Sequence, residues 1–129
     1  VRAMTEAVRC DIRRRLEAMV TDTARAYGCE AAFEYERGPS PVINDEALCR
    51  RAASLARAQG LEVRENPPSM IAEDFSEYLK IAPGAMFRVG TGGGYDNHHP
   101  RFTADPEALM PAAAFFAALA ERELRQLAA

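Results

Sequence analysis

Two prolines and a glycine within five residues, at positions 37–41 (Arg-Gly-Pro-Ser-Pro), impose the strongest constraint on how this chain folds. Proline lacks the N–H group that helices and central strands need, and a glycine beside it favours a turn. This segment is therefore predicted to end one structural piece and to start another. We expect residues 1–40 and residues 41–129 to be separate pieces of the chain.

The first piece is predicted to contain a helix followed by a strand. Apolar residues recur every three or four positions over residues 5–27, with Thr5 as the N-terminal cap and Gly28 in the left-handed position after the end. Charged residues between them are expected to face solvent: Arg9, Asp11, Arg13, Arg14, Arg15 and Glu17. Residues 30–36 alternate acidic and apolar side chains, which predicts a half-exposed antiparallel strand. A single helix and strand are too little to fold alone, so their apolar face and open edge require a partner.

The second piece is predicted to be a mixed α/β unit. Helices are expected over residues 44–59 with Asn44 as the cap, over residues 74–79, and from Asp105 to residue 127. Proline follows Asp105, at the first helical position, where its missing N–H has no cost. Short apolar runs at residues 61–63 and 86–89 predict strands.

Composition excludes several classes of protein. The net charge of −3 argues against a nucleic-acid surface, because phosphate binding needs clustered positive charge. No apolar run approaches the roughly 20 residues of a membrane span, and the first twenty residues are too charged for a signal peptide. The three cysteines form no C-x-x-C pair and are expected to be structural thiols. Unpaired thiols favour a reducing compartment, so we expect the protein in the cytoplasm.

The chemistry-bearing residues lie between positions 70 and 105. Residues 73–76 read Glu-Asp-Phe-Ser, residues 83–90 read Pro-Gly-Ala-Met-Phe-Arg-Val-Gly, and a glycine-rich stretch at 90–94 leads to His-His-Pro-Arg-Phe at 98–102. Both histidines of the chain are therefore adjacent, and histidine is the commonest neutral metal ligand. A catalytic zinc normally needs about three protein ligands, so a metal site here is expected to be incomplete.

In order and spacing these motifs resemble the C-terminal part of the metal-dependent aminoacylase/carboxypeptidase amidohydrolases, of the hippurate hydrolase and indole-acetyl-amino-acid hydrolase type. That family carries E-D-F-[SA], then P-G-x-x-F-x-x-G, then H-x-P-x-[FY], then an acidic residue that opens a long final helix. The resemblance covers nearly all of the chain. It implies a fragment: residues 41–129 as the C-terminal part of a zinc-peptidase-like catalytic domain, and residues 1–40 as the last strand–helix–strand of a ferredoxin-like lid and dimerisation domain.

The resemblance also implies where a metal would bind. His98 matches the first histidine of the H-x-P motif, a ligand for zinc, manganese, cobalt or nickel. His99 occupies the variable position and is expected to face solvent or to support the metal-binding residues without touching the metal. The family's other ligands and its catalytic base belong to an N-terminal half that is not in this sequence. We therefore assign no catalytic residue in this chain and expect it to hold no metal tightly by itself.

Two further groups of residues have two interpretations each. Glu73 and Asp74 could act as general acid and base, but acids at a helix start are also favoured by capping and the helix dipole, and we favour that structural role. Gly90, Thr91 and Gly92 form a wall of the substrate pocket by resemblance, or a flexible loop without a ligand. They lack the spacing of a phosphate-binding loop.

Three more residues also have both a functional and a structural interpretation. Asn44 resembles the family's hinge between lid and catalytic domain, although a helix cap already explains it. Arg88 and Arg101 could pair with a substrate carboxylate, but placement on the surface is the simpler expectation.

Two functions from different classes follow. The first is a metal-dependent amidohydrolase or peptidase that cleaves the amide of N-acyl amino acids or related small substrates, with this chain inactive alone. Its partners would be the small substrate and a second subunit bound through the lid, with neither nucleic acid nor membrane. The alternative is a non-catalytic α/β module for interaction or dimerisation. Tight metal binding near His98 in the longer protein would distinguish the two.

Overall fold

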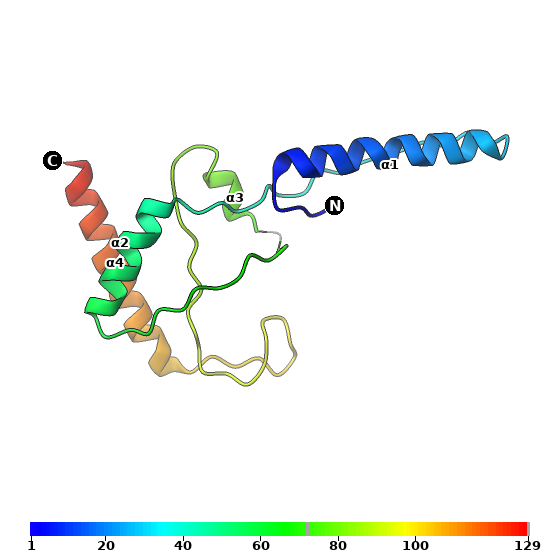
Figure 1. Cartoon of the computed structure of the whole chain (residues 1–129). Helices are drawn as coiled ribbons and strands as arrows, with labels where there is room; N and C mark the ends of the chain where they lie inside the picture. Colours follow the sequence, from blue (N-terminus) through cyan, green and yellow to red (C-terminus); the bar gives the residue numbers. More distant parts are fainter. Residues whose placement is uncertain (72, 129) are drawn as a thin grey trace. The chain divides into compact units, whose positions relative to one another are not determined.

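The computed structural model describes residues 1–71 and 73–128. Within these residues it contains the helices α1 (Glu6–Ala26), α2 (Glu46–Ala58), α3 (Phe75–Tyr78) and α4 (Pro106–Leu127), joined by turns and extended segments (Figure 1). The chain divides into two compact units. Unit 1 comprises Val1–Asn44 and Asn66–Gly84, and unit 2 comprises Asp45–Glu65 and Ala85–Ala129. The assignment of residues 1–40 to a lid and 41–129 to a catalytic domain concerns a longer protein and stays a prediction.

In unit 1, α1 begins and ends where its capping residues are. The Thr5 hydroxyl accepts a hydrogen bond from the Val8 N–H at 3.3 Å. Gly28 follows the last turn with a φ of 68°, a conformation that glycine adopts without strain. The predicted caps and helix are thus confirmed to within a residue at each end. The apolar stripe of α1 is largely exposed, with Val8 at 50% and Met19 at 64%.

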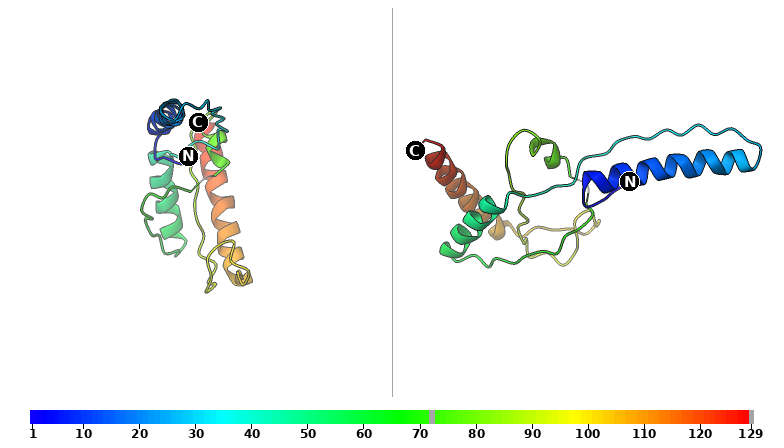
Figure 2. Two further views of the ribbon diagram at one scale, coloured as in Figure 1. Left: turned by 90° about the vertical axis from the view of Figure 1, so that its right-hand side faces the viewer. Right: turned by 45° about the horizontal axis from the view of Figure 1, so that its top comes forward.

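The chain after α1 turns back and runs alongside the helix (Figure 2). The guanidinium of Arg13 lies over the Tyr35 ring at 5.4 Å from its centroid, and Tyr35 stacks on Phe33. Residues 30–36 were predicted to be a strand, but no strand is assigned anywhere in residues 1–71 and 73–128. A strand needs a neighbouring strand for its N–H and C=O groups, and a single extended segment has none.

In unit 2, α2 and α4 pack against each other, as Figures 1 and 2 show. The buried core consists of Ala52, Ala56, Phe115 and Leu119. The ring of Phe87 packs edge-on against Phe115, with centroids 5.9 Å apart. Burying an aromatic or leucine side chain contributes about 1.5–3 kcal/mol, so Phe115 and Leu119 each contribute to the apolar stabilisation of unit 2.

Two details of unit 2 correct the sequence predictions. The cap of α2 is Asp45, whose carboxylate accepts from the Leu48 N–H at 2.7 Å, and not Asn44 one residue earlier. Residues 61–63 and 86–89, predicted as strands, are extended segments without a strand partner, although Val63 and Phe87 pack on the core. The α/β class is therefore not confirmed, and the described residues are helical and extended. None of these helices combines the length and the apolar character that a membrane span requires.

Candidate functional site

The loop that carries His98 starts after the extended Phe87 segment of unit 2 and ends at α4. Its two ends are joined by a hydrogen bond of 2.8 Å from the Asp105 N–H to the Thr91 carbonyl oxygen. The Asp105 carboxylate then accepts from the Glu107 N–H at 3.0 Å and caps α4. One residue, Asp105, thus both closes the loop and begins the helix. The acidic residue that the family motif places before its final helix has this role here.

Two glycines of this loop are required for its backbone to close. Gly92 has a φ of 68°, and a side chain at Gly93 would collide with the Thr103 carbonyl oxygen. In contrast, an added Cβ at Gly90 or Gly94 would meet nothing within 4 Å. The requirement for glycine at positions 92 and 93 therefore comes from the loop's own backbone. Whether Gly90, Thr91 and Gly92 also line a substrate pocket stays a prediction.

His98 and His99 differ sharply in their surroundings. His98 has a φ of 70°, in the left-handed region that residues other than glycine seldom occupy. Its side chain is exposed and, among the described residues, has no hydrogen-bond partner. His99 stacks on Tyr95, with ring centroids 4.3 Å apart and planes inclined by 7°.

His99 makes a further contact within its own loop. Its Nδ1 atom accepts a hydrogen bond of 3.1 Å from the Arg101 backbone N–H. Among the described residues, His98 makes no such contact. The assignment of His98 as the metal ligand, and of His99 as a residue that does not bind the metal, stays a prediction.

The sequence did not indicate the role of Tyr95. Besides stacking on His99, its hydroxyl accepts a hydrogen bond of 3.4 Å from Nη1 of Arg101. Arg101 is therefore exposed but hydrogen-bonded within its own loop. Arg88 is exposed. A loop has no regular repeat, so the spacing of four residues between Tyr95 and His99 did not predict that their rings stack.

The other predicted site residues belong to unit 1. The carbonyl oxygens of Glu73 and Asp74 accept from the N–H groups of Ser76 and Glu77, at 3.1 and 2.9 Å, and form the first turn of α3. The Asp74 side chain lies at the N-cap position but makes no capping hydrogen bond. Glu73 and Asp74 therefore begin α3 through their backbone carbonyl groups, and not through their carboxylates. Asn44 is the last residue of the first segment of unit 1.

No complete metal site lies within residues 1–71 and 73–128, where no three side chains of His, Cys, Asp or Glu are grouped to hold an ion. A ring nitrogen of His98 would fit a metal only as one ligand of a larger set, so the predicted role of His98 stays a prediction. The donor type suits zinc and the other first-row divalent metals equally.

Comparison with known families identifies the class of protein. The chain belongs to Peptidase family M20/M25/M40, whose profile matches residues 2–122. The resemblance found in the motifs is thereby confirmed for almost the whole chain.

Curated relatives include two deacetylases of Bacillus subtilis (strain 168). The chain is 35% identical over 124 residues to its N-acetyl-L-cysteine deacetylase, covering 96% of this chain and 30% of that protein. It is 32% identical over 120 residues to its N-acetylcysteine deacetylase, covering 93% of this chain and 32% of that protein. The chain thus spans about a third of the length of these relatives, which fits the expected fragment. No solved structure matches the chain significantly.

Proposed function

We propose that the protein to which this chain belongs is a metal-dependent amidohydrolase that cleaves the amide bond of N-acyl amino acids. The family match supports a hydrolase. Two relatives are named for removing the acetyl group of N-acetylcysteine, which supports small N-acyl amino acids as the substrate class. The observation that carries the proposal is His98, exposed on a left-handed turn with both ring nitrogens uncommitted, at the motif position of the family's metal ligand.

The chain's own residues would contribute one metal ligand and its support. His98 would bind a divalent metal ion, zinc, manganese, cobalt or nickel, together with ligands from outside this chain. When bound, such a metal supplies an activated water and polarises the substrate carbonyl. The closed loop keeps His98 in place through the bond between Asp105 and Thr91. Because most ligands and the base are elsewhere, we propose that this chain alone is inactive.

The finer architecture belongs to the same proposal. We propose that residues 41–129 complete an α/β catalytic domain and that residues 1–40 complete a lid through which two subunits associate. The exposed apolar stripe of α1 supports a partner surface there, since such patches mark contacts. The free thiols of Cys10, Cys29 and Cys49 support a reducing compartment, and hence the cytoplasm.

The two adjacent histidines provide the test. In the longer protein, His98→Ala should abolish hydrolysis of N-acetyl amino acids and lower the bound metal measured by elemental analysis, because a metal ligand is lost. His99→Ala is the matched control and should keep most of both, because His99 occupies the variable position of the motif and its Nδ1 already accepts a hydrogen bond from the Arg101 N–H. Equal losses of metal in the two variants, or a greater loss for His99→Ala, would contradict the assignment.

A further inference from the structure

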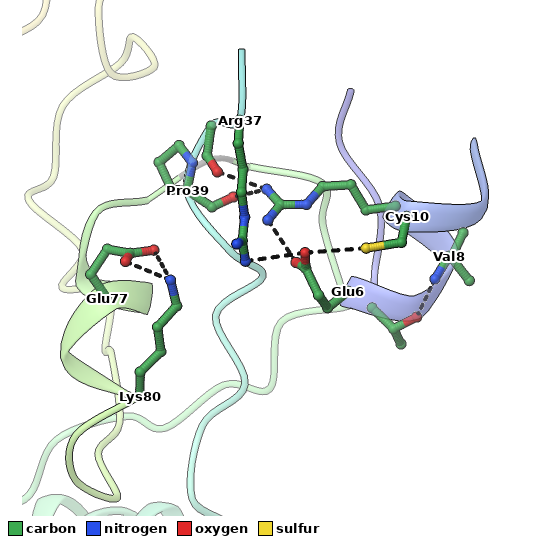
Figure 3. A network of polar contacts seen from close by, with 10 residues as sticks. Glu6, Val8, Cys10, Arg37, Pro39, Glu77 and Lys80 are labelled. Atoms are coloured by element: carbon green, nitrogen blue, oxygen red, sulfur yellow. Dashed lines mark hydrogen bonds and ion pairs between the residues drawn. The ribbon is translucent and has the colours of Figure 1, made fainter. Parts of the chain in front are cut away.

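Arg9 and His98 are each held in a state that costs free energy. Arg9 was predicted to face solvent, but its side chain is 3% exposed, and burying a guanidinium is costly unless partners satisfy it. Those partners belong to unit 1. Arg9 donates hydrogen bonds of 2.7 Å to the carbonyl oxygens of Gly38 and Pro39, and it forms an ion pair of 2.6 Å with Glu6 (Figure 3). Contacts within the chain therefore explain the burial of Arg9.

The strained backbone of His98 has no such explanation. Among the described residues, His98 is the only residue other than glycine with a positive φ. This conformation costs free energy because the Cβ atom comes too close to the following carbonyl oxygen. The imidazole is exposed and, within the described part of the chain, makes no hydrogen bond that could offset the cost. Strained residues of this kind cluster at active sites and ligand-binding sites, so the conformation indicates a function for the side chain.

The backbone around His98 explains why its φ is positive. The His99 N–H donates to the Asp96 carbonyl oxygen at 3.1 Å, which closes a four-residue turn with Asn97 and His98 at its centre. A positive φ at the third residue alone corresponds to a type II turn, where glycine is usual at that place. The Phe102 N–H then donates to the His99 carbonyl oxygen at 2.9 Å and closes a second turn. The first turn thus places His98 where glycine would fit, and the second fixes the residue after it.

We propose that the turn of residues 96–99 positions His98 for the metal, with Asn97 as the positioning residue. This role rests on the proposed function, in which His98 is a metal ligand. The turn fixes the direction in which the imidazole leaves the backbone, and histidine at this position lowers the stability of the loop relative to glycine. A ligand held in its binding conformation loses less conformational freedom when the metal binds, so the affinity for the metal rises.

Asn97 allows the turn to be changed without altering the ligand. Its side chain is exposed, and among the described residues its N–H has no hydrogen-bond partner. Proline is favoured at the second position of a turn because its ring fixes φ, and here it would remove no hydrogen bond. Asn97→Pro should therefore tighten the turn. Asn97→Gly should loosen it, because glycine has more conformations to lose, and Asn97→Ala should fall between the two.

Hydrogen exchange of the His99 amide measures the turn in this chain, because that amide closes it. After correction for intrinsic rates, Asn97→Pro should slow the exchange by about two- to fivefold, and Asn97→Gly should speed it by about the same factor. His98→Gly relieves the strained position and should slow the exchange by about threefold. His98→Ala should not slow it, because alanine is strained there too. Exchange of the Asp105 amide, where the loop closes, should change by less than about twofold in these variants.

In the longer protein, the affinity for zinc should follow the same order. Zinc titration should give a dissociation constant about two- to fivefold lower for Asn97→Pro and higher by about the same factor for Asn97→Gly. Ala104→Gly is the matched control, because Ala104 is exposed in the same loop but lies outside both turns, and it should change the zinc constant by less than about twofold.

Two results would overturn the proposal. One is an equal exchange rate of the His99 amide in Asn97→Pro and Asn97→Gly, which would mean that the turn does not form. The other is an equal zinc dissociation constant in these two variants, which would give the turn a purely structural role. A longer protein that binds no zinc, with the exchange rates still in the expected order, would contradict the proposed function and not the turn.

Discussion

Gly93 determines whether the loop that carries His98 can close. A Cβ at this position would collide with the Thr103 carbonyl oxygen, whereas one at Gly94 would meet nothing within 4 Å. Gly93→Ala should therefore destabilise the closed loop by about 1–3 kcal/mol, the usual cost of overpacking. Faster hydrogen exchange of the Asp105 amide, which bonds to Thr91, would measure this loss.

Gly94→Ala is the matched control for that measurement. It adds the same methyl group one residue later and should leave the exchange of the Asp105 amide within about 0.5 kcal/mol of the unmodified chain. If both variants exchange at the same rate, the close approach of Gly93 to Thr103 is absent in solution.

Single residues were predictable from the sequence where their effect is local. Thr5 and Gly28 cap α1 as predicted, because capping depends on neighbours within a few positions. The burial of Arg9 and the hydrogen bond from the Arg101 N–H to His99 were not predictable, since each depends on a contact set by the folded backbone. His98 was found through the family motif, and its φ of 70° came only from the structure.

Among the elements, α2 depends on Asp45. The carboxylate accepts from the Leu48 N–H, which has no partner within the helix. Asp45→Ala should lower the stability of unit 2 by about 1 kcal/mol, and Asp45→Asn should restore most of it, because asparagine also caps well. Thermal unfolding followed by circular dichroism would show the difference. An Asn variant as unstable as the Ala variant would mean that the charge, and not the cap, stabilises the helix.

The ion pair between α2 and α4 makes unit 2 sensitive to acid. Glu123 accepts from Arg51 at 2.9 and 2.5 Å, and this hydrogen bonding lowers the pKa of Glu123 below its ordinary value. A lowered pKa stabilises the folded state above the ordinary value near 4.5 and loses that contribution as pH falls through the folded-state pKa. Glu123→Gln should therefore flatten the decrease in stability below that pH.

The control for this pH dependence is Glu121→Gln on the same helix. Among the described residues, Glu121 forms its ion pair with Arg125 of α4 itself, and both side chains are mostly exposed. Urea unfolding at several pH values should show a curve close to that of the unmodified chain. A flattened curve for both variants would assign the acid sensitivity to the net charge of α4 and not to the contact with α2.

At the scale of the whole chain, the helices could be predicted and the strands could not. The periodicity of α1, α2 and α4 is contained within each segment, so local sequence suffices. Residues 30–36, 61–63 and 86–89 have strand-like patterns, but a strand forms only beside another strand. Within the described residues no such neighbouring strand is present, and these three segments are extended without forming strands. The same lack of partners leaves apolar surface exposed.

That exposed surface predicts self-association of the chain through α1. Leu16, Met19 and Val20 lie on one stripe of the helix and are exposed by 36%, 64% and 38%. Contiguous apolar surface of this kind favours contact with another molecule. Sedimentation equilibrium at tens of micromolar, a concentration at which exposed apolar surface commonly associates, should therefore show dimers or larger species. Met19→Glu should shift them toward monomer, whereas Thr21→Glu adds the same charge away from the stripe and should not. A monomeric unmodified chain, or equal effects of the two substitutions, would show that the stripe is not the contact surface.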